Sequence, residues 1–342
     1  MKLHHALLIF CLCSLLWACP AGIFSSRDGN FITKVIPLTD FNSEFDDYNS
    51  TLPMNKSGVG YLVFSSKRQR KDFFNLVEFP VKVDNNDQDN PIVSTNIGYN
   101  SDYIAEHKFI SEYINRTLGN HNILGPFVLT KSNLVSFGSS PKYQFLYYAD
   151  DSTGNLDIKV VYLNNDKTIG PIKVDFLNSS KDDAYPYITN YGDKIYFCSN
   201  REGNFDIYEA TVGDKFKTNN TTNIVQQITN PVESKIEKIS SISSNYDDKC
   251  PHIIANNILV FTSNRTGGFG GYDIYYSIQK DNKWSEPINA GARINTKYDE
   301  YRPISVAENA FNFPLIIFSS NRPGGKGGFD LYMTGLIEKY AY

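Results

Sequence analysis

A set of charged residues recurs at matching places in the second half of the chain, and these are the first candidates for chemistry. They are Asp182, Asp206, Asp247, Asp273, Asp299, Asp330, Arg201, Arg265 and Arg322. Carboxylate oxygens are ligands that Ca²⁺ accepts, and a guanidinium suits the carboxylate of a partner. A binding or catalytic site is not needed in every repeat. The repetition therefore favours a structural role, in which the carboxylates fix turns and connections. Each Arg is expected to bond the backbone or an Asp of the neighbouring repeat.

Other catalytic residues are scarce in this sequence. The chain beyond its first residues holds only His107, His121 and His252, without a pair at metal-ligand spacing, and it has no Gly-x-Ser-x-Gly motif. We therefore expect no enzyme, no metal and no cofactor. His252, beside Pro251, is the one His that we expect could face a central channel. A glycosidase needs two carboxylates facing one sugar, which a funnel can supply, so that alternative stays open.

The charged residues belong to a repeated pair of strands. Three segments match closely, Ile195–Arg201, Leu259–Arg265 and Ile316–Arg322, and each ends in Ser-Asn-Arg. A Gly-bearing stretch follows each, and then an aromatic-Asp-aliphatic-Tyr run, as in Tyr272–Tyr275. An apolar run, a Gly-rich turn and a second apolar run predict a β-hairpin. Weaker copies begin at Phe64 and Tyr147.

A second element precedes the hairpins and ends in paired acidic residues, such as Asp182-Asp183, Asp247-Asp248 and Asp299-Glu300. A Pro follows the first acidic residue of each, at Pro186, Pro251 and Pro303. Pro is tolerated at the first residue of a strand, so we predict that a new strand starts there. Hairpin, connection and flanking strands make a unit of four strands, which is a propeller blade.

Spacing predicts an all-β propeller of five blades, with six as the alternative. Only the gap between Asn75 and Asp157 is long enough to hide a further blade. Its apolar residues recur at helical spacing over 101–119, which predicts a helical insertion that packs on the propeller or contacts a partner. Gly125–Leu129 is interpreted as a fourth strand. The β-rich stretch Phe31–Leu38 is expected to complete the last blade and close the ring.

These motifs resemble the WD-like propeller repeat of the TolB type, in the version found in Bacteroidetes envelope proteins beside OmpA-like domains. The match is nearly full from Trp284 to Tyr332, good over residues 140–337 and weak over 31–80. The resemblance implies a propeller that serves as a binding platform. No OmpA-like region follows it in this sequence.

The first residues predict export and a lipid anchor. Lys2 precedes a short apolar run that ends in Leu16-Trp17-Ala18-Cys19, which resembles a bacterial lipobox, whose Cys becomes the lipidated first mature residue. The expected division is a signal peptide over 1–18, a tether over 19–29 and the propeller over 30–342, with its insertion at about 100–120. The alternative is an ordinary secretory signal with Cys19 incidental. Cys198 and Cys250 either pair or, as we expect, stay as separate buried thiols.

Composition and charge narrow the partners. Net charge is −4, without the basic face that nucleic acid requires. Residues Pro20–Ser26 lack the acidic residues typical of surface-exposed Bacteroidetes lipoproteins, so we expect the periplasmic face of the outer membrane. The function expected from these points is a non-catalytic scaffold or accessory subunit that binds outer-membrane or periplasmic proteins. The alternative is a glycan-binding or glycan-cleaving propeller.

Overall fold

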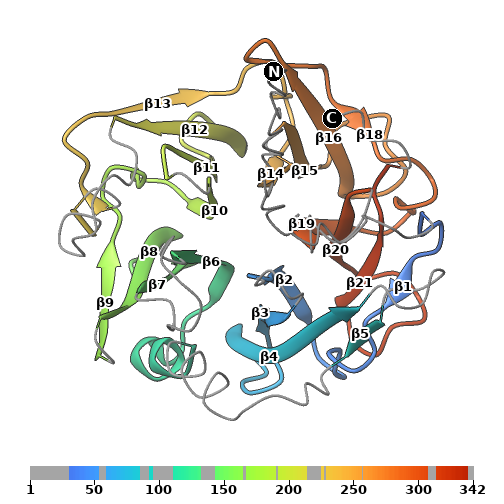
Figure 1. The fold of residues 1–342 in the computed structure, drawn as a ribbon, viewed down its shortest axis with the longest axis horizontal. Helices are drawn as coiled ribbons and strands as arrows, with labels where there is room; N and C mark the ends of the chain where they lie inside the picture. Colours follow the sequence, from blue (N-terminus) through green and yellow to red (C-terminus); the bar gives the residue numbers. More distant parts are fainter. Residues whose placement is uncertain are drawn as a thin grey trace, which may run out of the picture.

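The computed structural model is a five-bladed β-propeller, with the blades arranged around a central axis (Figure 1). It describes residues 31–53, 59–84, 92–94, 111–131, 143–164, 167–189, 192–213, 225–226, 229–255, 257–306 and 313–337. The prediction of an all-β propeller with five blades is confirmed.

Each blade is an antiparallel sheet whose first strand lies nearest the axis. Blade 1 consists of β2 (Asp47–Thr51), β3 (Val59–Ser66), β4 (Asn75–Asp84) and β5 (Ile92–Ser94). Blade 2 consists of β6 (Ile123–Lys131), β7 (Tyr143–Asp150), β8 (Asp157–Asn164) and β9 (Lys167–Lys173). Blade 3 consists of β10 (Asp183–Ile188), β11 (Lys194–Ser199), β12 (Asp206–Val212) and β13 (Ser234–Lys238).

The last two blades complete the ring. Blade 4 consists of β14 (Asp248–Ile254), β15 (Ile258–Ser263) and β16 (Asp273–Lys280), whose outer edge pairs with β17 (Lys283–Trp284) and β18 (Ile288–Asn289). Blade 5 consists of β19 (Glu300–Val306), β20 (Leu315–Ser320), β21 (Asp330–Gly335) and β1 (Ile36–Pro37). Because β1 comes from the start of the chain and pairs with β21, the expected closure by an N-terminal strand is confirmed.

The hydrophobic core lies between blades. Each of the five interfaces between neighbouring blades has its own cluster of buried side chains, such as Ile207 with Ile253 between blades 3 and 4. Inner strands therefore bury both faces, and all six residues of β15 and of β20 are buried. The outermost strand β13 is polar and largely exposed. This gradient explains why the repeated apolar runs in the sequence mark the second strand of each blade.

Two strand predictions are wrong. Gly125–Leu129 belongs to β6, the innermost strand of blade 2, and the fourth strand of blade 1 is β5 instead. Innermost strands also begin at the second acidic residue, as at Asp183 and Asp248, and not at the Pro. In each case Pro lies inside the strand, at a break in its register with the next strand. A bulge tolerates Pro because the ladder hydrogen bond is already missing there.

The helical insertion is described over residues 111–119, of which 111–118 form a helix, and residues 101–110 of the predicted segment lie outside the described residues. Ile114 is buried between blades 1 and 2. Asn115 accepts a hydrogen bond from the amide of Leu76 and donates one to its carbonyl, both at 2.8 Å. This part of the insertion packs on the propeller. Among the described residues no helix has the length and hydropathy to span a bilayer.

Candidate functional site

The repeated arginines hold their own blade together. Arg201, at the end of Ser-Asn-Arg, lies 2.7 Å from the buried carboxylate of Asp183, which begins the innermost strand of the same blade. The same guanidinium donates to the carbonyl of Leu177, in the connection that enters the blade. Equivalent ion pairs join Arg68 to Asp47, Arg265 to Asp248 and Arg322 to Glu300. These guanidinium groups are engaged in ion pairs within the protein. Their carboxylate partners come from the same blade, whereas a partner in the neighbouring blade is expected from the sequence.

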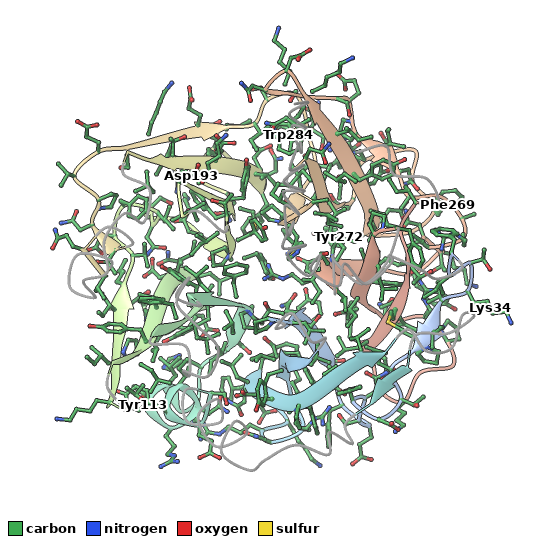
Figure 2. All side chains as sticks on the ribbon, in the orientation of Figure 1. Lys34, Tyr113, Asp193, Phe269, Tyr272 and Trp284 are labelled. Carbon is green, nitrogen blue, oxygen red and sulfur yellow. The ribbon has the colours of Figure 1, made fainter. Side chains whose placement is uncertain are left out.

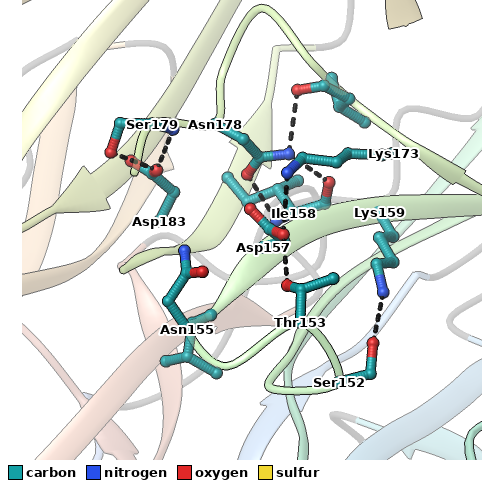
Figure 3. Close-up of polar contacts among 12 residues, drawn as sticks. Ser152, Thr153, Asn155, Asp157, Ile158, Lys159, Lys173, Asn178, Ser179 and Asp183 are labelled. Atoms are coloured by element: carbon teal, nitrogen blue, oxygen red, sulfur yellow. Dashed lines mark hydrogen bonds and ion pairs between the residues drawn. The ribbon is translucent and has the colours of Figure 1, made fainter. Parts of the chain in front are cut away.

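The first acidic residue of each connection joins two blades. Asp182, Asp247 and Asp299 each accept the backbone amide hydrogen of the residue that begins the third-strand run of the preceding blade. These amides belong to Leu156, Phe205 and Tyr272, at 2.9, 3.1 and 2.8 Å. Figure 3 shows the same interface between blades 2 and 3, where Asn178 also bonds both backbone groups of Ile158. Such contacts fix the angle between blades.

The aspartates that begin the third strands also bond within their own blades. Asp206 lies 2.7 Å from Lys238 of β13. Asp273 accepts from the Asn289 side chain and from turn amides, and Asp330 accepts from the amide of Gly327. Among the described residues, no three His, Cys, Asp or Glu side chains are grouped so that they could hold a metal ion. Within the described structure, the repeated carboxylates therefore act in turns and between strands.

One repeated feature points at the axis. Each innermost strand breaks its register at a residue with positive φ, and these residues are Asn49, Gly125, Tyr185, Cys250 and Arg302, with φ from 52° to 59°. Four of the five are followed by Pro. A residue other than glycine rarely adopts a positive φ. Because the same conformation recurs in all five innermost strands, it is a regular feature of this fold. The bulges place the side chains of different blades against one another on the axis.

At the end of the axis where the innermost strands begin, aromatic side chains from several blades pack together. Tyr48 stacks on Tyr301 with ring centroids 5.0 Å apart, and Tyr272 meets Tyr301 edge-on at 5.2 Å. Further partly buried side chains join this cluster, including Phe205 of blade 3 and Phe329 of blade 5. We call this cluster of rings the aromatic floor. Figure 2 shows Tyr272 near the centre of the propeller, whereas Phe269 lies near the periphery.

A charged group borders the aromatic floor. The Lys249 ammonium lies 2.7 Å from Asp247, and the Tyr272 hydroxyl donates to the same carboxylate at 2.8 Å. Burial alone raises the pKa of Asp247, but hydrogen bonds from Lys249 and the Phe205 amide outweigh it and hold the pKa below its usual value. Burial also raises the pKa of the Tyr272 phenol to about 12. At neutral pH this group is therefore a carboxylate, an ammonium and a neutral phenol.

A polar cleft of about 580 Å³ opens between blades 3 and 4. It is lined by Lys238, Ser243, Ser244, Asn245, Tyr246, Arg265 and Thr266, and we call it the outer cleft. Tyr246 is 41% exposed there. The connection that carries Tyr246 continues into Asp247, and the hairpin that carries Thr266 continues to Tyr272. The same two loops thus build the outer cleft and one side of the aromatic floor.

His252 and the two cysteines have structural surroundings. The ring of His252 meets Tyr187 edge-on at 4.6 Å, and burial together with the charge of Arg302 lowers its pKa to about 3, so the ring is neutral. Cys198 and Cys250 are free and buried, as expected. Cys19 and the rest of the predicted signal and tether lie outside the described residues.

Several residues of this region escaped the sequence analysis. Tyr48, Lys249, Tyr301 and Arg302 lie beside or at the positive-φ position of innermost strands, but they come from three blades, which meet only around the axis. The usable signal was the residue before each repeated Pro, which aligns Tyr185, Cys250 and Arg302 at one level of the ring.

Comparison with family models and with curated proteins gives no match. Solved structures of similar fold include an endo-arabinase from Bacteroides thetaiotaomicron, with 12% identity over 89% of this chain and 99% of that chain and a TM-score of 0.49. Another is an α-L-arabinofuranosidase from Lactobacillus brevis, with 11% identity over 91% and 97% and a TM-score of 0.48. A family 117 glycoside hydrolase from Zobellia galactanivorans has 11% identity over 91% and 88% and a TM-score of 0.46.

The expectations of a non-catalytic protein-binding scaffold, and of a chain that is not an enzyme, are corrected by this comparison. The three structures named above are glycoside hydrolases. The sequence repeats gave a wrong prediction of function because their repeated residues join the strands and blades. They carry little information about the loops that form the surface. At these identities the likeness concerns the fold, so support for the alternative has to come from the residues of this chain.

Proposed function

We propose that this propeller acts on glycans and takes a saccharide across the aromatic floor and the outer cleft. One observation carries the proposal. Two loops at one end of the propeller present an exposed Tyr246 over a polar cleft and, further along the same loops, Asp247 and Tyr272 beside the stacked rings of the axis.

This combination suits the chemistry of a sugar. One face of a sugar ring is lined by C–H groups, which pack on the flat face of an aromatic side chain. Its hydroxyls need donors and acceptors at fixed positions, and ligand sites typically supply a few of these within a cleft of this volume. Asn245 and Thr266 line the outer cleft with exposed side chains that offer donors and acceptors. Asp247 offers a charged acceptor at the floor.

Cleavage of a bound glycan would require a second carboxylate that carries a proton. Asp247 is held in its charged form by Lys249 and Tyr272, which suits the base or nucleophile of such a pair. Asp47, Asp183 and Asp248 are each engaged by an arginine and buried, so they are poor candidates for the acid. Glu300 is also paired with an arginine, although burial raises the pKa of its carboxyl.

The proposal also covers the type of propeller repeat and the cellular location of the protein. The Ser-Asn-Arg and Asp-aliphatic-Tyr motifs support a TolB-type repeat, and the lipobox-like segment supports acylation of Cys19. We propose that the protein is anchored by lipid in the outer membrane and faces the periplasm. Outer-membrane or periplasmic proteins would be its neighbours there.

The test is a screen of purified protein against plant, algal and bacterial oligosaccharides, with binding and release of reducing ends measured in parallel. Saturable binding of at least one saccharide class, with or without cleavage, is the expected result. The proposal would be overturned if the protein neither bound nor cleaved any glycan in the panel.

A further inference from the structure

The guanidinium of Arg302 lies on the propeller axis. Arg302 occupies the positive-φ position of β19 and is only 2% exposed. Its Nη2 donates to the carbonyl of Pro126 in blade 2 at 3.1 Å, and its guanidinium carbon lies 5.5 Å from the centre of the Tyr185 ring in blade 3. The side chain therefore reaches across the axis from blade 5 to strands of two other blades.

This guanidinium differs from the arginines of the repeats. Each of those has a carboxylate oxygen within 2.9 Å. In the described part of the chain, Arg302 makes no ion pair, and its Nε and Nη1 are buried without an oxygen acceptor, although the guanidinium approaches the Cys250 thiol. An unpaired buried charge strongly destabilises a fold, so a counter-charge is expected here.

The surrounding side chains do not supply that charge. Burial raises the pKa of the Tyr48, Tyr185 and Tyr301 phenols, and it raises the pKa of the Cys250 thiol to about 12 despite the nearby Arg302. His252 is neutral as well. Asn49 holds the matching bulge of β2, next to β19, and its buried Nδ2 also has no partner among the described residues.

We propose that the axis of the propeller binds a small monovalent anion of the chloride type, held by Nε and Nη1 of Arg302. The site offers one positive charge, unpartnered nitrogen donors and no acidic group. Its burial favours an ion without a large organic part. The bound ion would neutralise the axis and tie together the inner strands of separate blades. This proposal is independent of the glycan proposal.

The direct experiment is a crystal of the full protein grown in bromide, with data collected at the bromine absorption edge. An anomalous peak in contact with Nε or Nη1 of Arg302 is expected. Water density there without anomalous signal would overturn the proposal, and this experiment needs no variant.

A solution experiment separates a functional site from one filled only in crystals. Because an ion that binds the native state raises Tm, wild type should melt higher in sodium chloride than in sodium gluconate of equal ionic strength, by about 2 °C or more. Arg302→Met should lose this difference. The matched control is Arg293→Met, whose guanidinium is already bonded to the Thr334 hydroxyl and to the carbonyls of Gly335 and Leu336. An equal chloride effect in all three proteins would contradict the proposal.

Discussion

Asn42 holds Leu331 by both of its backbone groups, although the two residues lie at opposite ends of the chain. The Leu331 amide donates to Asn42 Oδ1 at 2.8 Å, and Asn42 Nδ2 donates to the Leu331 carbonyl at 3.0 Å. Asn178 and Asn295 make the same pair of bonds to Ile158 and Ile274 at other blade interfaces. Ring closure thus uses the device that joins consecutive blades.

Asn42→Ala should lower the free energy of unfolding by about 1–3 kcal/mol, because it leaves the buried amide of Leu331 without its acceptor, whereas the Leu331 carbonyl keeps its hydrogen bond from the Leu38 amide. Urea unfolding followed by circular dichroism measures this. Asp40→Ala, at an exposed position nearby, is the control and should stay close to wild type. Equal stability of Asn42→Ala and wild type would show that these bonds do not support closure.

Removal of residues 30–38 should unfold the protein or make it aggregate. The deletion takes away β1 and leaves the edge of β21 unpaired, and it removes the Ile32 carbonyl that accepts from the Gly335 amide. Size-exclusion chromatography and thermal melting report the outcome. A deleted protein that stays monomeric with unchanged Tm would refute the role given to this strand.

Much of this fold could be predicted from the sequence, because similar short sequence motifs recur from blade to blade. Ser-Asn-Arg and Asp-aliphatic-Tyr together mark the two strands of one hairpin. The spacing of these hairpins, with their weaker copies, predicts five blades. The bulges are not predictable in this way, because Pro is normally excluded from the interior of a strand. Pro186 and Pro251 therefore indicate strand starts in the sequence. The floor was missed for another reason: Tyr48, Tyr272 and Tyr301 belong to three blades, and only ring closure brings them together.

His252 should make stability depend on pH in mildly acidic solution. Its pKa is about 3 in the folded protein and 6.5 when unperturbed, so the stabilisation is fully present above pH 6.5 and is lost as pH falls towards 3. The unfolded chain takes up the proton first, which lowers stability by up to about 1.4 kcal/mol for each pH unit. His252→Phe should flatten the dependence of unfolding free energy on pH between pH 6.5 and 5. Identical slopes in His252→Phe and wild type would contradict this.

Cys19 should carry fatty acid when the full chain is made in a bacterium with a lipoprotein export pathway. Metabolic labelling with an alkyne fatty acid should mark wild type and leave Cys19→Ala unmarked. Equal labelling of the two proteins would remove the basis for a lipid anchor.

The central claim is that the loops around the outer cleft and the aromatic floor bind a saccharide. Calorimetric titration of the best oligosaccharide from the screen tests it most directly, with wild type, Tyr246→Ala and Phe269→Ala. Both aromatic side chains are exposed and carried by loops of blade 4, but only Tyr246 lines the outer cleft. We predict that Tyr246→Ala weakens binding about tenfold or more, equivalent to about 1.4 kcal/mol, and that Phe269→Ala binds like wild type. Equal affinity of all three proteins would contradict the proposed site.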